Sequence, residues 1–270
     1  MKLNSENYFS PEMQQAYMGV SQYKDFLDCP ARAMATIRGE YVPEMSKALL
    51  VGSYVDAYFE GTLDKFKAEH PEIFNSRTGE LKVDYKQADE IIARLEGDPV
   101  CAEYLSGKKQ VIKTAKLFGA KWKIKIDSYF PGDKIVDLKV MRSLERIMGI
   151  SFIEYWGYDL QMAIYSEVEY LSSRRKNKQR LETYLDVATK EDPADLAVIH
   201  IPAWRRQECL KEVEKNMPRI LAYKSGELEA PGCGVCPYCR GKKVVKGPIE
   251  FDAVGFSNKE LAAMEGKTWG

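Results

Sequence analysis

The chain has 270 residues, 45% of them hydrophobic, so it can bury one large core or two small ones. Lysine plus arginine and aspartate plus glutamate both number 40, so bulk charge does not indicate a nucleic-acid binder, and such binding must rely on local basic patches. The sequence has no run of eighteen apolar residues and no apolar signal core near its start, which predicts a cytoplasmic protein without a membrane helix and without disulfides between its six cysteines.

The predicted elements form an α/β pattern along the chain. A helix begins after Ser10, a second begins at Ser21, a third covers 45–60, and the charged, helical residues 61–106 look like an insertion or cap. Strands follow at 110–118, 120–130 and 134–140, then a long helix at 148–171, strands at 181–189 and 196–202, and a helix at 204–224. A capping box at Ser257 predicts a short tail helix. This order predicts a single domain over 1–270 with one central mixed sheet flanked by helices.

Two acids and a lysine lie on neighbouring strands of a predicted hairpin. The turn is the Phe-Pro-Gly-Asp stretch at 130–133, which brings Asp127 close to Asp137 and Lys139. Converging carboxylates can hold a hard divalent cation, and a lysine beside it can steady a water or a phosphate. The alternative is an ordinary surface hairpin whose alternating charges face solvent.

The cysteines predict a second metal site. Cys233, Cys236 and Cys239 form a CxxCxxC loop within residues 229–241, which favours a metal over free thiols. A tetrahedral site needs a fourth ligand, and Cys29, at the end of a short helix, is the best candidate. The spacing favours a 4Fe–4S cluster, with structural zinc as the alternative; Cys101 and Cys209 are expected to be buried apolar residues.

Polar residues also interrupt two apolar helical stripes. Tyr158, Gln161 and Tyr165 share one face of the long helix, where they either point at a polar site or simply pack in the core. Asp56 interrupts the stripe of the 45–60 helix and needs a cation or metal partner if it is buried.

Taken together, these motifs resemble the PD-(D/E)XK nuclease superfamily, and within it the phage-type exodeoxyribonuclease VIII (RecE-like) group. The matching segments are GSYVDAYFEG at 52–61, KIKIDSYF at 123–130, IVDLK at 135–139 and GYDLQMAIY at 157–165. The placement of the four cysteines resembles that of iron–sulfur nucleases. RecE-like proteins usually carry a histidine where this chain has Asp56.

The resemblance implies a restriction-endonuclease-like core and a Mg²⁺- or Mn²⁺-dependent DNA exonuclease of phage recombination or DNA repair. Asp56, Asp127, Asp137 and the Leu138 carbonyl would ligate the metal, Lys139 would position or activate water, and Gln161 and Tyr165 would orient Lys139 or the DNA. It also implies a single-strand annealing protein as partner, and a homo-oligomer is possible. The alternative is a non-catalytic DNA-binding or assembly module that keeps the fold and the cysteine site.

Overall fold

The structure, a computed structural model, describes residues 2–176, 178–245, 247–248 and 251. The predicted tail helix at Ser257 lies outside the described residues. The chain divides into two compact units, one built from residues 1–43, 117–121 and 213–270 and the other from residues 44–116 and 122–212.

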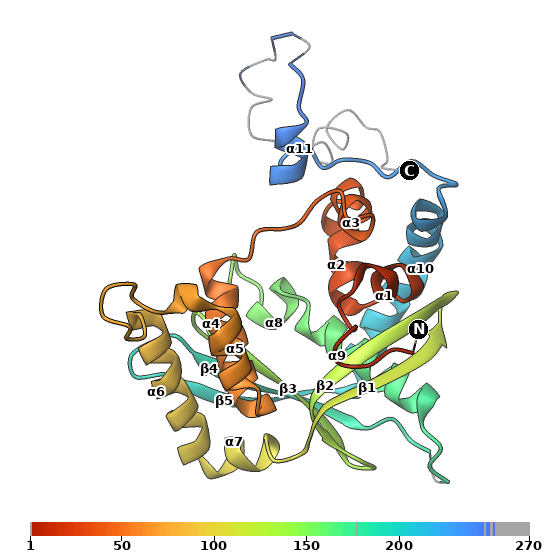
Figure 1. The fold of residues 1–270 in the computed structure, drawn as a ribbon. Coiled ribbons are helices and arrows are strands. Elements are labelled where there is room, and N and C mark those ends of the chain that lie inside the picture. The colour runs from red at the N-terminus through yellow and green to blue at the C-terminus, as the bar shows by residue number, and fades with distance from the viewer. Residues whose placement is uncertain (1, 177, 246, 249–250, 252–270) are drawn as a thin grey trace. The chain divides into compact units, whose positions relative to one another are not determined.

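The second of these units is organised around a five-stranded sheet. Its strands, in spatial order and in chain order alike, are β1 (Lys108–Leu117), β2 (Ala120–Phe130), β3 (Lys134–Met141), β4 (Glu182–Thr189) and β5 (Leu196–Ile201) (Figure 1). β2 and β3 are antiparallel, β3 and β4 are parallel, and β4 and β5 are antiparallel. The predicted mixed sheet and all five predicted strands are therefore confirmed.

The turn between β2 and β3 fixes the pairing of these strands. The Asp133 N–H donates to the Phe130 carbonyl at 3.1 Å, and Gly132 has a φ of 88°, which a side chain would make unfavourable. Ser128 pairs with Val136 and Tyr129 with Ile135. Because the pairing is antiparallel, extending it by one residue places Asp127 opposite Asp137.

Helices from residues 47–104 cover one face of the sheet. They are α4 (Lys47–Glu60), α5 (Leu63–Glu69), the 3₁₀ turn η1 (Pro71–Ile73), α6 (Val83–Gly97) and α7 (Pro99–Tyr104). Tyr54, Ile91 and Leu95 are buried in one cluster with Leu138 of β3 and Ala188 of β4. Each fully buried aliphatic side chain stabilises such a core by about 1.5–3 kcal/mol. The charged 61–106 segment is thus helical, as predicted, and packs against the sheet.

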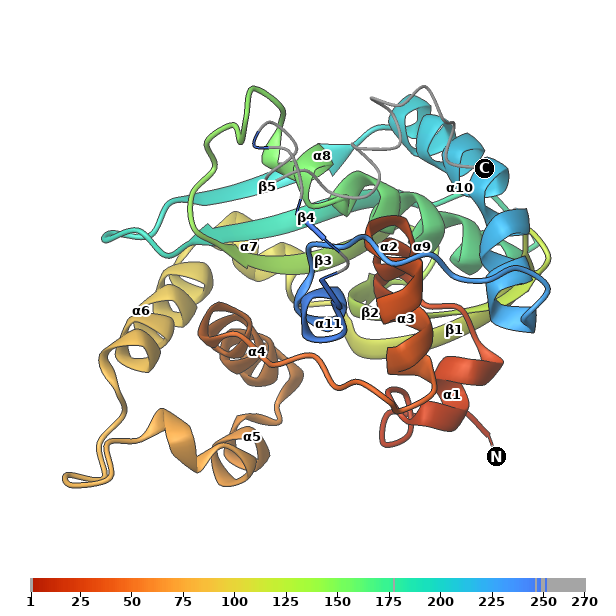
Figure 2. The ribbon, with the colours of Figure 1, turned by 90° about the horizontal axis from the view of Figure 1, so that it is seen from above.

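The long helix predicted at 148–171 is in fact two helices, so that prediction was wrong at its N-terminal end. α8 (Phe152–Tyr155) is followed by Gly157 in the left-handed conformation, with a φ of 60°, and α9 (Tyr158–Ser172) starts afresh after it. A residue in that conformation cannot continue a right-handed helix. Figure 2 shows β3, β4 and β5 side by side from above, with α8 and α9 in green.

The other unit is helical. It contains α1 (Pro11–Ala16), α2 (Val20–Asp28), α3 (Pro30–Ile37), α11 (Pro237–Gly241) and the C-terminal half of α10 (Ala203–Ser225), the helix that runs from one unit into the other. The Ser10 hydroxyl caps α1, as predicted, whereas α2 starts after Gly19 instead of at Ser21. Cys29 ends α2 and also begins α3. Among the described residues, no helix is both long and apolar enough to cross a membrane.

Candidate active site and metal centre

Two carboxylates meet across the β2–β3 hairpin, as the sequence predicts. Asp127 Oδ2 accepts a hydrogen bond from the Leu138 N–H at 3.1 Å, which ties the acid of β2 to the backbone of β3. Asp137 is only 2% exposed. It lies within β3 and not at its end, because β3 pairs with β4 as far as Met141. The sheet register therefore holds both acids on the hairpin.

Side chains from β3 and α9 surround Asp137. Gln161 Nε2 donates to Asp137 Oδ1 at 2.7 Å, and the Lys139 ammonium forms an ion pair with Asp137 Oδ2. Lys139 also donates to the Leu138 carbonyl at 3.2 Å and lies 5.3 Å from the centre of the Tyr158 ring. Tyr165 is buried one turn further along α9 than Gln161. The polar face of the predicted helix thus points at the hairpin acid through Gln161.

Asp56 of α4 belongs to the same electrostatic cluster. Burial raises the pKa of Asp56 to about 7; the Lys139 charge opposes this shift, and the Asp137 charge adds to it. Burial, followed by repulsion from Asp137, also raises the pKa of Asp127 well above its usual range. Burial opposes the charge of Lys139, but Asp137, Asp127 and Asp56 outweigh it and raise the pKa of the ammonium. Three acids therefore share one neighbouring lysine.

This donor set suits a hard divalent cation. Carboxylate and carbonyl oxygens are the ligands that Mg²⁺ and Mn²⁺ prefer, and a cation would offset the burial and the repulsion that raise the pKa values of Asp56 and Asp127. In the part of the chain that the structure describes, the three acids do not close into one group within 4.8 Å, and only the four cysteines do so. Asp137 is near enough to raise the pKa values of Asp56 and Asp127, but the oxygens of the three acids would have to move closer together to share one ion.

Residues of β1 form one wall of the site, and the sequence did not indicate this. A small cavity of about 10 Å³, the space of roughly one water, is lined by Asp56, Glu60, Lys109, Gln110 and Asp127, together with Phe59, Leu105 and Leu138. Gln110 Nε2 donates to Asp127 Oδ1 at 3.4 Å. A lone glutamine between charged and apolar residues carries no recognisable pattern, so nothing short of the structure places it here.

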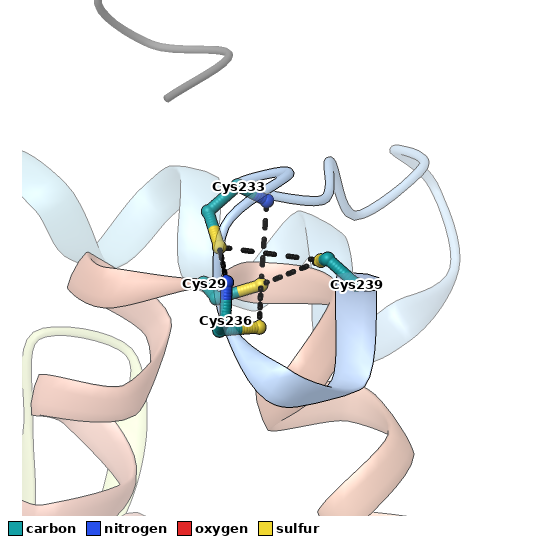
Figure 3. A group of neighbouring side chains, drawn as sticks. All are labelled: Cys29, Cys233, Cys236 and Cys239. Carbon is teal, nitrogen blue, oxygen red and sulfur yellow. Dashed lines mark hydrogen bonds between the residues drawn. The ribbon is translucent and has the colours of Figure 1, made fainter. Parts of the chain in front are cut away.

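The four predicted cysteines come together in the helical unit. All four Sγ atoms lie within 4.8 Å of one another, with Cys29 Sγ 3.6 Å from Cys239 Sγ and 3.8 Å from Cys236 Sγ (Figure 3). Cys233 Sγ lies 4.0 Å from Cys239 Sγ. Cys101 and Cys209 are buried elsewhere, as predicted. Residues separated by some 200 positions in the chain thus present four sulfurs to one point.

Backbone N–H groups and close packing shape this centre. The Cys233 N–H donates to Cys29 Sγ at 3.4 Å, and the Cys236 N–H donates to Cys233 Sγ at 3.3 Å. Burial opposes ionisation of Cys233, but the Val235 and Cys236 N–H groups lower its pKa; burial raises the pKa of Cys29 to about 12. A Cβ on Gly232 would lie 3.0 Å from Cys239 Sγ. Four thiols, one of them with a lowered pKa, suit a thiolate-binding metal.

Comparison with known proteins gives the class of the chain. Residues 19–242 match the family described as "PDDEXK-like domain of unknown function (DUF3799)". Because the match covers most of the sequence, the chain belongs to this PDDEXK-like family. The predicted superfamily and fold class are confirmed.

A solved structure agrees with this assignment. It is a crystal structure of a protein from Eubacterium rectale that is provisionally named an exonuclease, 47% identical, with a TM-score of 0.88 over 97% of this chain and 99% of that chain. A second structure, SSO0001, is 14% identical with a TM-score of 0.32 and supports no argument. No curated protein matches the sequence.

Proposed function

We propose that the chain is a divalent-metal-dependent exonuclease that hydrolyses the phosphodiester bonds of DNA. The observation that carries the proposal is the arrangement of the hairpin acids, with Asp127 bonded to the Leu138 N–H of the neighbouring strand and Lys139 ion-paired to Asp137. The provisional name of the Eubacterium rectale protein, exonuclease, supports the same activity. Mg²⁺ and Mn²⁺ are the candidate ions, since the acids offer only oxygen ligands.

Each site residue has a proposed role. Asp127, Asp137, Asp56 and the Leu138 carbonyl would hold the ion, which when bound would lower the pKa of a water and neutralise charge on the scissile phosphate. The raised pKa of Lys139 keeps the ammonium protonated, so it would donate hydrogen bonds to the attacking water or to a phosphate oxygen. Gln161 would fix Asp137 through its 2.7 Å bond. Tyr165 would support that face of α9.

The finer biological role follows from the RecE-like resemblance. A phage-type enzyme of recombination or repair would digest linear duplex DNA and leave a 3′ single strand for an annealing protein, and it could work as a homo-oligomer. A digestion of linear and covalently closed circular duplexes of the same sequence tests this: an exonuclease degrades the first and spares the second.

The four cysteines would hold one structural metal. Four thiolates placed tetrahedrally at about 2.3 Å from a single zinc ion have sulfurs about 3.8 Å apart, close to the 3.6, 3.8 and 4.0 Å distances found here. A 4Fe–4S cluster separates its four ligand sulfurs further, although CxxCxxC with a distant fourth cysteine is a ferredoxin-type spacing. We therefore place zinc first, ahead of the cluster that the sequence favours.

Two measurements decide these proposals. Wild-type protein with Mn²⁺ should release nucleotides from linear duplex DNA, and Asp137→Asn protein should release none. If the wild type binds DNA but never cleaves it, the non-catalytic DNA-binding alternative is correct. Elemental analysis of anaerobically purified protein, with its visible absorbance, separates zinc from iron in the cysteine centre.

A further inference from the structure

Gln110 of β1 has a backbone conformation that its residue type disfavours. Its φ is 53°. Of the three non-glycine residues with positive φ in the described chain, Phe118 and Met148 lie in connections and only Gln110 lies within a strand. Such left-handed residues inside strands typically mark a bulge that re-aims a side chain, and they are frequent beside active sites.

The re-aimed side chain reaches a proposed metal ligand. Gln110 Nε2 donates to Asp127 Oδ1 at 3.4 Å, while Asp127 Oδ2 accepts from the Leu138 N–H. The other hairpin acid, Asp137, receives an amide N–H from Gln161 in the same way. Each hairpin acid is therefore oriented by one glutamine amide, one from β1 and one from α9.

The other end of the Gln110 amide is buried without a partner. Gln110 Oε1 accepts no hydrogen bond from any described residue, and the side chain lines the small cavity shared with Asp56, Glu60 and Asp127. A buried acceptor without a donor is unfavourable, and so is the left-handed backbone, so two costs meet at one residue. The Lys109 ammonium, which lines the same cavity, donates to the Leu105 carbonyl, so the Gln110 amide oxygen is left open to a donor from a bound species such as a water.

We propose that Gln110 is a positioning residue of the metal site: its amide N–H fixes Asp127, and its amide oxygen accepts a hydrogen bond from a water on the bound cation. This inference rests on the proposed function, because it needs the acids to bind a divalent ion. It assigns a role to β1, a strand that carries none of the nuclease motifs. Partners that orient metal ligands typically change metal affinity 10- to 100-fold when removed.

The test measures Mn²⁺ binding directly, by calorimetry on protein whose cysteine centre is left loaded. Gln110→Asn keeps a residue type that tolerates the left-handed backbone but is too short to span both contacts, so Mn²⁺ affinity should fall about 10- to 100-fold. Gln110→Glu keeps the acceptor oxygen but loses the amide N–H to Asp127, so its Mn²⁺ affinity should lie between those of Gln110→Asn and wild type. Gln87→Ala, which removes a hydrogen bond to the Lys190 carbonyl, is the matched control and should bind as wild type.

The outcomes separate this inference from the nuclease proposal. Unchanged Mn²⁺ affinity in Gln110→Asn, alongside lost affinity in Asp137→Asn, would overturn the role of Gln110. A lower melting temperature with wild-type Mn²⁺ affinity would mean that Gln110 is only structural. If wild-type protein binds Mn²⁺ through Asp137 but cleaves no DNA, the nuclease proposal fails, and the Mn²⁺ affinities still decide the role of Gln110.

Discussion

The hairpin acids and the cysteine centre are the two proposed cation sites, and they are assembled in opposite ways. Asp127, Asp137 and Lys139 lie within thirteen residues of chain, and strand pairing places them before any ion binds. The cysteines come from residues 29 and 233–239: Cys29 lies at the junction of α2 and α3, and the other three lie in α11 and in the segment before it. The first site concentrates charge on a rigid scaffold, whereas the second closes a long loop.

This difference predicts what each metal would do. Burial, with repulsion from Asp137, raises the pKa values of Asp56 and Asp127, and a cation would offset this, so the ion at the acids should be exchangeable and should serve chemistry. Closing a loop of about 200 residues restricts the unfolded chain, so the ion at the cysteines should be retained and should serve stability. The predictions below test this division, from the largest expected effect to the smallest.

Removing one hairpin charge should abolish activity without unfolding the protein. Asp137→Asn keeps the shape and the Gln161 contact but weakens the metal site, so DNA hydrolysis should fall on the order of a thousandfold. Asp133→Asn, an exposed acid in the adjacent turn, is the control and should cleave normally. Equal losses in both variants would mean that the hairpin acids have no special role.

Removing a cysteine ligand should have the reverse effect. Cys29→Ser should lower the free energy of unfolding by at least about 3 kcal/mol, because the loop is no longer closed by a metal. Urea denaturation and metal content are the measurements, and Cys209→Ala, a buried cysteine outside the centre, is the control. If Cys29→Ser protein retained its metal and its stability, the metal at the cysteines would not have the proposed structural role.

Asp186, a buried acid outside both centres, tests how much a buried carboxylate lowers the free energy of unfolding where no metal is proposed. Asp186 of β4 is fully buried, and burial raises its pKa to about 7, although the Cys101 thiol and the Lys109 charge oppose the shift. A raised pKa means that the associated stability is complete below about pH 4 and is lost as the pH rises through 7. Asp186→Asn should therefore match wild type at pH 4 and exceed its free energy of unfolding by about 2–4 kcal/mol at pH 8. Parallel stability curves across this range would show that Asp186 does not titrate as stated.

The smallest effect is the pH dependence of ion binding at the acids. Since the pKa of Asp56 is raised to about 7, a cation must displace its proton below that pH. Mn²⁺ should bind at least about tenfold more tightly at pH 8 than at pH 6, with proton release on binding, and Asp56→Asn should weaken the dependence. Calorimetry in buffers of different ionisation enthalpy measures both quantities. An equally steep profile in Asp56→Asn would assign the proton to another acid.

Sequence patterns predicted the sheet and the hairpin acids because both depend on local signals. Period-2 alternation around Trp122 and Ile124, and Pro-Gly at the turn, are encoded within a few residues. The break at Gly157 was missed because a glycine inside an apolar helical stripe is usually tolerated. Gln110 was missed because its positive φ arises from the fold around it and not from its residue type. The four cysteines were grouped from their chemistry alone, since no periodicity relates residue 29 to residue 233.

Cys29 takes part both in the backbone turn between two helices and in the proposed metal site. It ends α2, begins α3 and offers a thiol to the cysteine centre. During evolution, a residue that replaces Cys29 would have to meet two requirements: it must allow the backbone to turn between two helices, and it must supply a sulfur ligand. Pro30, which directly follows and favours the start of α3, then limits how the turn could be rebuilt around a different ligand. Relatives that lose the proposed metal should therefore change the α2–α3 turn as well as the cysteine.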